Sequence, residues 1–275
     1  MLAESKSLAE SKSVDVLLEV RADVCQEPPR RNVWLEAGPY VVRLAVTERD
    51  RAAAFRLRFL VFNLELNEGL ESAFVDGYDT DMYDAACDHL IVLHRETGAV
   101  VGTYRLQMGD VAGRNFGYYG EQEFDFSPYE GLRSQIVELG RACIHRDHRS
   151  TEVLNLLWKG IARYVIGNGG RYMIGCCSLP SLDNAVGHAV YKSLKNYMVP
   201  QELMTVPTPK YRMPHALTEA ENVAPPKLLR AYLTIGAKIC SEPAIDWEFK
   251  TIDFLTLLDL QTLHPRVASR FLEGC

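Results

Sequence analysis

The sequence predicts a mixed α/β (α+β) fold, and three observations lead to this prediction. The 275 residues are 47% hydrophobic and 24% charged, an ordinary globular balance with ample apolar material for a core. Short β-branched runs, typical of strands, are interspersed with segments whose apolar residues recur at helical spacing. Their order is β-α-β-β-β-α-β-α-β, which lacks the regular β-α-β alternation of a fully parallel sheet.

The sequence predicts an N-terminal arm followed by one domain. We expect residues 1–36 to form a poorly ordered arm, because LAESKS at 2–7 recurs at 8–13 and lacks the apolar stretch of a secretory signal. One or two helical turns are expected around Val14–Val24. Residues 37–275 are expected to form a single domain that includes a C-terminal extension.

Within that domain, apolar runs and turn signals mark the elements. YVVRLAV predicts a strand, and Thr47 can cap the helix after it. The acidic stretch 67–85 predicts a long loop, and Glu96-Thr97-Gly98 joins two apolar runs as in a β-hairpin. QIVELGRACI predicts a strand in which Gly140 is a candidate bulge. The later predicted elements are the helix 150–167, the strand 172–179, the helix 181–194, a strand over 196–206, a helix over 228–239 and a strand over 246–260.

Charge and cysteine usage narrow the functional classes. Thirty Lys and Arg against 36 Asp and Glu give a net charge of -6, which disfavours general attraction to nucleic acid. No apolar run approaches the roughly 20 residues needed to cross a bilayer. The seven cysteines are scattered and odd in number, so reduced thiols are the simplest interpretation and a cytoplasmic location is expected.

Acidic and basic side chains concentrate near the predicted ends of elements. Asp81 and Asp84 lie in the long loop, and Arg105 lies at the end of the hairpin. Glu138 and Arg141 stand three apart on one predicted strand, so they face opposite sides unless the strand bulges. Such carboxylates could hold a cationic amine and take its proton, and the arginines could grip a carboxylate or phosphate. A salt-bridged rim around a sheet edge is the structural alternative.

The segment His145-Arg146-Asp147-His148-Arg149 has two functional interpretations. As a metal site it offers two histidines three apart without a third ligand in view, so no metal is expected. As an anion site it is a basic cluster just before a helix N-terminus, where free N–H groups favour a phosphate. We prefer the second interpretation, with Arg146, His148 and Arg149 as the binding residues.

Several motifs resemble the ornithine-lipid N-acyltransferases, also described as hemolysin-like acyltransferases, of the GNAT acyltransferase superfamily. They are CDHLIV, VVGTYRL, GYYGEQEFDFSP, VELGRACIHRDHR and LLWKGIARYV, and with the C-terminal segment the resemblance covers about residues 40–271. It implies a GNAT-like mixed, mostly antiparallel central sheet flanked by helices, with extra C-terminal elements. It also implies an enzyme that forms an amide from an acyl thioester.

A more distant resemblance, to acyl-homoserine-lactone synthases, implies where the site lies. The residues that match the site pattern of those enzymes are Arg58, Phe62, Asp81, Asp84, Arg105, Glu138 and Arg141. The resemblance implies that the acidic loop and the central strand form a substrate site. The acids of the loop would order it or bind the acceptor amine, and the strand arginines would hold that loop or the acceptor carboxylate.

The same resemblance implies a reaction without a covalent enzyme intermediate. Glu138 would be the base or the amine anchor. The backbone N–H groups near Cys143 and Ile144 would polarise the thioester carbonyl. The Cys143 thiol itself is interpreted as inert packing in a buried strand rather than as a nucleophile.

The loop after the central strand departs from ordinary GNAT enzymes. Those have a Gly-rich loop that cradles the coenzyme A pyrophosphate, whereas this chain reads RDHRST. We therefore expect acyl carrier protein, with its phosphopantetheine thioester, as the donor in preference to acyl-CoA, and no permanently bound cofactor. The other expected partners are a small amine or amino acid and, by peripheral contact, the inner face of the cytoplasmic membrane, but no nucleic acid.

The predicted function is transfer of a (3-hydroxy)fatty acyl group to the α-amine of an amino acid such as ornithine, in ornithine-lipid biosynthesis. One alternative is an acyl-homoserine-lactone-like synthase or another N-acyl amino acid synthase. A second is a non-catalytic module that binds acyl carrier protein or membrane.

Overall fold

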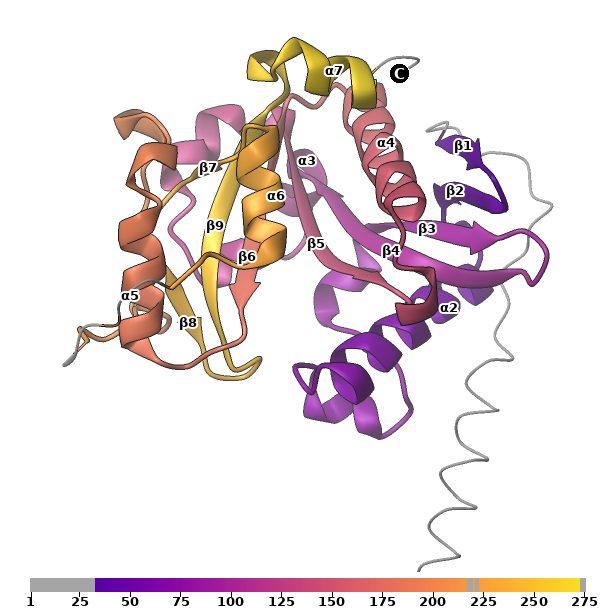
Figure 1. Ribbon diagram of the computed structural model, residues 1–275, viewed down its shortest axis with the longest axis horizontal. Coiled ribbons are helices and arrows are strands. Elements are labelled where there is room, and N and C mark those ends of the chain that lie inside the picture. The colour runs from indigo at the N-terminus through magenta and orange to yellow at the C-terminus, as the bar shows by residue number, and fades with distance from the viewer. Residues whose placement is uncertain (1–32, 217–219, 221–222, 273–275) are drawn as a thin grey trace, which may run out of the picture. The chain divides into compact units, whose positions relative to one another are not determined.

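The computed structural model describes residues 33–216, 220 and 223–272 (Figure 1). The helices and strands are β1 (Trp34–Ala37), β2 (Tyr40–Leu44), α2 (Glu48–Arg58), β3 (Asp88–His94), β4 (Ala99–Met108), α3 (Gly109–Arg114), β5 (Ile136–Ile144), α4 (Thr151–Gly167), β6 (Tyr172–Leu179), α5 (Asn184–Ser193), α6 (Lys227–Ile235), β7 (Lys238–Ile239), β8 (Ala244–Asp246), β9 (Thr251–Asp259) and α7 (Pro265–Leu272). Nearly all of the arm predicted over residues 1–36, with its helical turns, lies outside the described residues. Strand β1 begins at Trp34, inside that range.

The chain divides into two compact units, which are described separately. Unit 1 holds the described residues up to Thr80, together with His89–Tyr104 and Arg141–Gly160. Unit 2 holds Asp81–Asp88, Arg105–Gly140 and the described residues from Ile161 onward. Strands β4 and β5 and helix α4 contribute residues to both units.

Unit 1 is built on antiparallel strands. Strand β1 pairs with β2, and β2 pairs with β3. Strand β4 follows β3 in the sheet after the predicted turn, where Gly98 has a φ of 68° that glycine adopts without strain. The strand predicted at YVVRLAV and the predicted hairpin are both confirmed.

Helices cover both faces of the unit 1 strands. Helix α2 begins after Thr47, which forms a capping box with Asp50, so the predicted cap is confirmed. Its Ala54 packs on Ile91 of β3. On the other face α4 approaches so closely that a Cβ on Gly160 would lie 3.0 Å from a Val42 methyl. A π-helical segment, Phe59–Glu65, continues α2.

Unit 2 holds a sheet in which the C-terminal strand is an inner member. Strand β5 runs parallel to β6, and β6 pairs antiparallel with β9 along its whole length. Strands β7 and β8 both pair antiparallel with β9. The sheet is therefore mixed and mostly antiparallel, as expected, and the extra C-terminal elements complete it.

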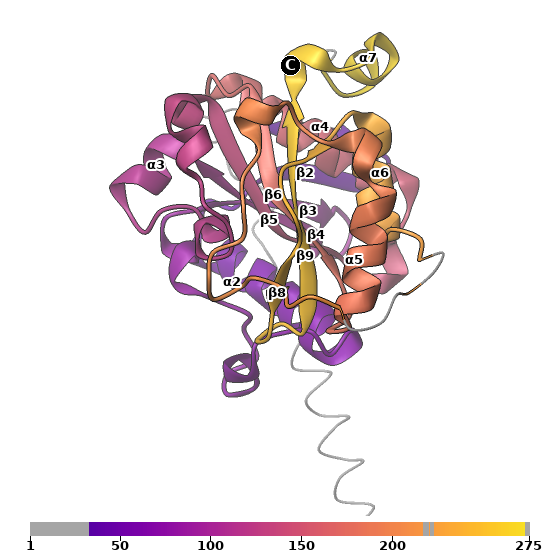
Figure 2. The ribbon, with the colours of Figure 1, turned by 90° about the vertical axis from the view of Figure 1, so that its left-hand side faces the viewer.

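Both faces of the unit 2 sheet are covered. Helices α5 and α6 share one apolar core with Ile252 and Phe254 of β9, and Figure 2 shows both helices on the same side of that strand. An aromatic segment, residues 118–129, packs on the opposite face against Leu255 and Leu257. Alternate residues of β9 thus enter different cores, as the two-residue period of a strand requires.

The structure differs from the sequence predictions at four elements, one of which is the helix predicted over 228–239: it ends at Ile235, and strand β7 begins at Lys238. The strand predicted over 196–206 is wrong: Pro200 interrupts it, and the segment forms short 3₁₀ turns that contact β7 through the N–H of Val199 and the carbonyl of Ile239 at 2.9 Å. The strand predicted over 246–260 is divided by a turn in which Lys250 has a φ of 58°. Helix α7 was not predicted.

Candidate active site

Glu138 lies on β5 in unit 2, and its carboxylate is held by a turn of the aromatic segment. Oε2 accepts the backbone N–H of Tyr119 at 2.8 Å, and Oε1 accepts that of Gly120 at 2.7 Å. The close approach favours glycine, because a Cβ on Gly120 would lie 3.1 Å from Oε1 and 3.0 Å from Phe126, so one of them would have to move. The sequence motif GYYGEQEFDFSP therefore supplies the turn that orients this carboxylate.

Burial decides the protonation behaviour of Glu138. The side chain is buried, and desolvation raises its pKa from 4.5 to about 7, although the N–H groups of Gly120 and Tyr119 and the charge of Arg105 act in the opposite direction. A carboxyl group that titrates near neutral pH can both accept and release a proton under physiological conditions. This is the property that a general base requires.

Arg105, Asp81 and Asp84 form a second cluster in unit 2, in which Arg105 and Asp84 are buried and Asp81 is partly exposed. Asp81 caps a 3₁₀ turn, Met82–Ala85, and forms a capping box with Asp84. Arg105 Nη1 binds both oxygens of Asp81, at 2.6 and 2.7 Å, and Asp84 Oδ1 at 3.2 Å. These contacts correspond to the first of the two predicted roles, in which the strand arginine holds the acidic loop.

Arg58 and Arg141 meet at Asp79 in unit 1. Arg58 Nε donates to Asp79 Oδ1 at 2.7 Å, and Arg141 Nη1 lies 3.5 Å from Asp79 Oδ2. Asp79 is fully buried, so the pair of cations neutralises a charge that would otherwise be costly. Arg141 has a φ of 50°, so the predicted irregularity of β5 occurs at the residue after Gly140.

Cys143 and Phe62 belong to an apolar cluster in unit 1 with Leu57 and Val61. Burial raises the pKa of the Cys143 thiol, with opposing effects from nearby charges, so the thiol stays protonated. This agrees with its interpretation as inert packing. The carbonyl of Ile144 accepts Arg149 Nε at 3.1 Å.

The three residues predicted to bind the donor differ in availability. Arg146 is 73% exposed and has an ion pair of 3.9 Å with Asp147. Arg149 is engaged with the Glu65 carboxylate at 2.6 and 2.8 Å. His148 Nδ1 lies 3.0 Å from the Tyr40 hydroxyl. Partial burial lowers the pKa of His148, and the neighbouring imidazoles of His145 and His94 act in the same direction.

One group of side chains among the described residues is placed to share a metal ion. The carboxylate oxygens of Glu123, Asp246 and Asp253 lie within 4.8 Å of one another in unit 2, and all three residues are buried. Burial, followed by the charges of the two aspartates, raises the pKa of Glu123 well above its usual value, and the Cys176 thiol donates to it at 3.7 Å. We interpret the group as acids that share protons, and the predicted absence of a metal stays a prediction.

Comparison with known proteins places this geometry in a family. A family model described as an acetyltransferase (GNAT) domain matches residues 57–159. The L-ornithine N(alpha)-acyltransferase of Agrobacterium fabrum is 30% identical over 274 residues, covering 94% of this chain and 92% of that protein. The enzyme of the same name from Rhizobium meliloti is 32% identical and covers 81% of this chain and 80% of its own length.

The chain belongs to the L-ornithine N(alpha)-acyltransferase family. It is therefore an acyltransferase with a GNAT-like fold, as the motifs implied. The member from Brucella abortus is 31% identical and covers 86% of this chain and 88% of that protein.

Solved structures support the fold of this family member. FeeM, an N-acyl amino acid synthase from uncultured soil microbes, aligns with a TM-score of 0.52 at 10% identity, over 82% of this chain and 93% of its own. The AHL synthase LasI aligns with a TM-score of 0.50 at 13% identity, over 86% and 95%. At these identities the likeness shows a shared fold alone.

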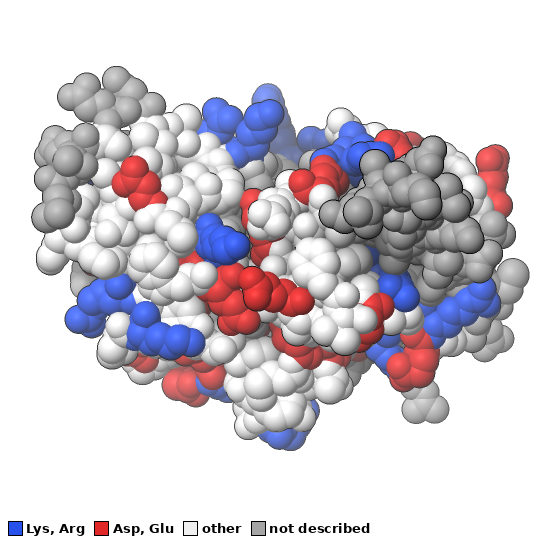
Figure 3. Space-filling model, turned by 90° about the horizontal axis from the view of Figure 1, so that it is seen from below, with Lys and Arg blue, Asp and Glu red and all other residues white. Residues whose placement is uncertain are grey.

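Two surface findings bear on partners of this acyltransferase. Among the described residues no helix is both long and apolar enough to span a bilayer. Both acidic and basic side chains are present on the face shown in Figure 3, and the net charge of the whole chain is -6.

The structure also identifies residues that sequence reasoning missed. Asp79 lies in the acidic stretch 67–85 but was not among the candidate site residues, yet it holds both Arg58 and Arg141. Tyr119 and Gly120 act through backbone N–H groups, which leave no signal in residue chemistry. The GYYG sequence, with glycines next to aromatic residues, was the available sign of a tight turn.

Proposed function

We propose that this family member transfers a fatty acyl group from a thioester to the α-amine of L-ornithine. The single observation that carries the proposal is the buried, doubly hydrogen-bonded Glu138, whose pKa of about 7 suits a base. The acceptor is suggested by relatives named L-ornithine N(alpha)-acyltransferase that cover most of the chain.

The proposed chemistry is a direct acyl transfer. Glu138 takes a proton from the ornithine ammonium, and the neutral amine attacks the thioester carbon. The C–N bond forms, the nitrogen loses its remaining excess proton to the departing thiolate as the C–S bond breaks, and Glu138 returns the first proton to solvent. The protonated, buried thiol of Cys143 favours this direct route over an acyl-cysteine intermediate.

Other residues have supporting roles in the proposal. Tyr119 and Gly120 orient the Glu138 carboxylate, and Arg105 orders the loop that carries Asp81. The backbone N–H groups near Cys143 and Ile144 are assigned to the developing oxyanion, a role that stays a prediction from the sequence.

We further propose acyl carrier protein as the donor. The loop after β5 offers exposed cationic character at Arg146 in place of the Gly-rich loop that suits a pyrophosphate. A carrier brings one phosphodiester and an acidic protein surface, both of which attract a guanidinium. The acylated product is a lipid, so peripheral contact with the inner face of the cytoplasmic membrane belongs to the same proposal.

The test is product identification with purified components. The chain is incubated with a 3-hydroxyacyl carrier protein or the matched acyl-CoA, and with L-ornithine, L-lysine, glycine, L-tyrosine or S-adenosylmethionine. We expect Nα-acyl-ornithine by mass spectrometry, formed faster from the carrier. Amide formation with another amine but not with ornithine would overturn the acceptor, and absence of any amide would support the non-catalytic alternative.

The donor assignment has its own matched pair of variants. Arg146→Gln should raise the KM for the acyl carrier protein with little change in the rate from acyl-CoA. Arg230→Gln removes an exposed arginine on α6 and should change neither. Equal KM values for the carrier in the Arg146 variant and the parent would contradict carrier binding at this loop.

A further inference from the structure

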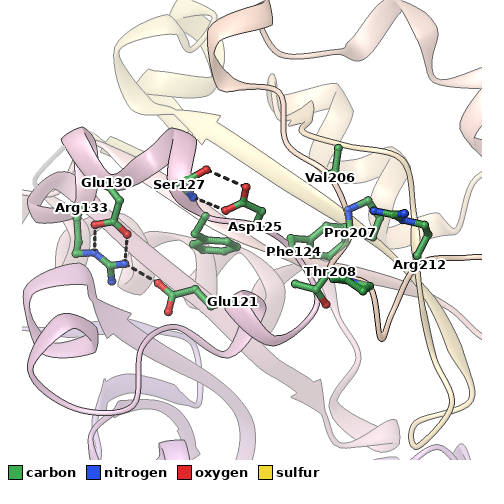
Figure 4. Close-up of a pocket in the computed structure, with 12 residues that line it drawn as sticks. Glu121, Phe124, Asp125, Ser127, Glu130, Arg133, Val206, Pro207, Thr208 and Arg212 are labelled. Carbon is green, nitrogen blue, oxygen red and sulfur yellow. Dashed lines mark hydrogen bonds and ion pairs between the residues drawn. The ribbon is translucent and has the colours of Figure 1, made fainter.

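Unit 2 contains a pocket of about 630 Å³ that no step of the proposed mechanism uses (Figure 4). Phe124, Phe126 and Pro207 give it apolar lining, whereas Glu121, Asp125 and Arg212 bring charge to it. The pocket is open to solvent, and its lining combines apolar side chains with a few charged groups. Its charge pattern shows which molecule it suits.

The charges around the pocket are only partly paired. Arg133 binds Glu121 at 2.6 Å and also Glu130, so these three form a closed network at one side. The Asp125 carboxylate accepts only from Ser127, at 2.9 Å to both the N–H and the hydroxyl, and has no cationic partner among the described residues. Figure 4 shows Asp125 between that network and the segment that carries Arg212.

Arg212 supplies the opposite charge. Its side chain is exposed and makes no hydrogen bond or ion pair within the described part of the chain. The pocket therefore presents one uncompensated anion and one uncompensated cation across an apolar surface. A molecule with a carboxylate and an ammonium joined by a short aliphatic chain satisfies both charges.

The pocket and the proposed base have neighbouring residues in common. The point where a Cβ on Gly120 would lie is 3.0 Å from Phe126, which lines the pocket, and 3.1 Å from Glu138 Oε1. Glu121, the next residue in the chain, also lines the pocket, and its charge helps to raise the Glu138 pKa. Phe126 and Glu121 therefore connect the lining of the pocket with the turn that holds the Glu138 carboxylate.

Other ligand classes fit the pocket less well. A fatty acyl chain would desolvate Asp125 and Arg212 without replacing their lost interactions. A phosphate would face Glu121, Asp125 and Glu130, and a diamine would face Arg212. A zwitterion with a second ammonium avoids all of these costs.

We propose that this pocket binds the acceptor amino acid, with Arg212 holding its carboxylate and Asp125, beside Glu121, holding its side-chain ammonium. The inference rests on the proposed acylation of an amino acid and assigns the residues that select it. The selectivity of the enzyme for ornithine then arises from two separable contacts, each with its own charge.

The experiment measures specificity ratios rather than rates alone. kcat/KM is determined for L-ornithine, for L-norvaline, which lacks the side-chain amine, and for putrescine, which lacks the carboxylate. Asp125→Asn should reduce the preference for ornithine over norvaline about tenfold, as expected for loss of a charge-assisted hydrogen bond. The same variant should leave the preference for ornithine over putrescine unchanged. Arg212→Gln should reduce the preference for ornithine over putrescine about tenfold and leave the preference over norvaline unchanged.

Matched controls and the opposing outcome are defined by the structure. Asp110→Asn and Arg230→Gln remove exposed charges outside the pocket and should leave both ratios unchanged. If both pocket variants keep both ratios within about twofold of the parent, the pocket does not bind the acceptor.

A failure of the pocket is distinguishable from a failure of the proposed function. If the parent acylates ornithine and the variants keep both specificity ratios, only the assignment of the acceptor to this pocket is overturned. If the chain acylates no amine, the function is overturned, and calorimetric titration with L-ornithine then decides the pocket. Heat of binding that Asp125→Asn and Arg212→Gln abolish would support it, and no heat with the parent would overturn it.

Discussion

Gly120 donates its backbone N–H to Glu138 Oε1 at 2.7 Å, and a Cβ at Gly120 would come within 3.1 Å of that same oxygen. A side chain on the residue that positions the carboxylate would therefore press against that carboxylate. Substitution at Gly120 is predicted to change the chemistry of Glu138 without touching the Glu138 side chain.

Gly120→Ala should lower turnover about tenfold and move the rising limb of the pH–rate profile to higher pH. The added methyl group displaces an N–H that lowers the Glu138 pKa, so the pKa rises above about 7. Steady-state kinetics across pH measures the shift. Gly131→Ala is the control, because a Cβ there meets nothing within 4 Å; equal profiles for the two variants would contradict the positioning role.

Glu138→Gln should lower kcat/KM by about 10²–10⁴ and abolish the rise in rate through pH of about 7. Burial raises the pKa of this carboxyl from 4.5 to about 7 in the folded state. The folded parent therefore loses stability as pH rises from 4.5 through about 7, because the buried carboxyl must give up its proton. Glutamine stays neutral, and the melting temperature of the variant relative to the parent should increase over that interval. A folded variant with full turnover would remove Glu138 as the base.

Gln107→Met should stabilise the fold and slow acylation. Gln107 is 2% exposed, and neither atom of its amide has a hydrogen-bond partner among the residues that the structure describes. It follows Arg105 by two positions on β4 and so shares its face, where substrate could supply the missing partner. We expect a gain of about 1 kcal/mol in urea unfolding, since a buried amide without a partner is costly, and a lower kcat/KM.

The control for Gln107 lies on the same face of β4. Thr103→Val removes a hydroxyl that donates to the Leu90 carbonyl at 2.9 Å, so it should destabilise the fold by about 1 kcal/mol. Opposite signs for the two variants would separate a partnered from an unpartnered group. Loss of stability in both would show that the Gln107 amide is hydrogen-bonded in solution.

Asp79→Asn should destabilise the fold by about 3–5 kcal/mol, because it leaves the buried Arg58 guanidinium without its counter-charge. Chemical denaturation measures the loss. The comparison is Glu36→Gln, which removes an exposed partner of Arg95 and should cost less than about 1 kcal/mol. Similar losses would mean that Asp79 carries no structural charge role.

Sequence patterns predicted the elements whose signals are local. The Thr47 cap, the turn at Gly98 and the helical spacing of α4 depend on neighbours within one or two turns of chain, and all three are confirmed. The strand expected over 196–206 failed because apolar residues near Pro200 pack without a regular ladder. The apolar pattern of this segment does not distinguish a strand from an irregular buried segment.

In the candidate site, too, the features that were missed depend on contacts between distant segments. The contact of Arg105 with Asp81 agrees with a role that the resemblance to acyl-homoserine-lactone synthases implied for Arg105. The N–H groups that hold Glu138 and the pocket that contains Asp125 arise from segments distant in sequence, 119–138 and 206–212. No local pattern encodes such encounters, since they depend on how strands of unit 2 bring loops together.

The inner position of β9 has a consequence for synthesis. On the ribosome β6 emerges long before the strand that pairs with it along its length, so for that interval β6 offers an open hydrogen-bonding edge. A nascent or prematurely terminated chain that stops before Thr251 keeps this edge, together with the apolar surface that Phe254 and Leu255 would otherwise occupy. Such fragments are expected to become clients of chaperones or to aggregate.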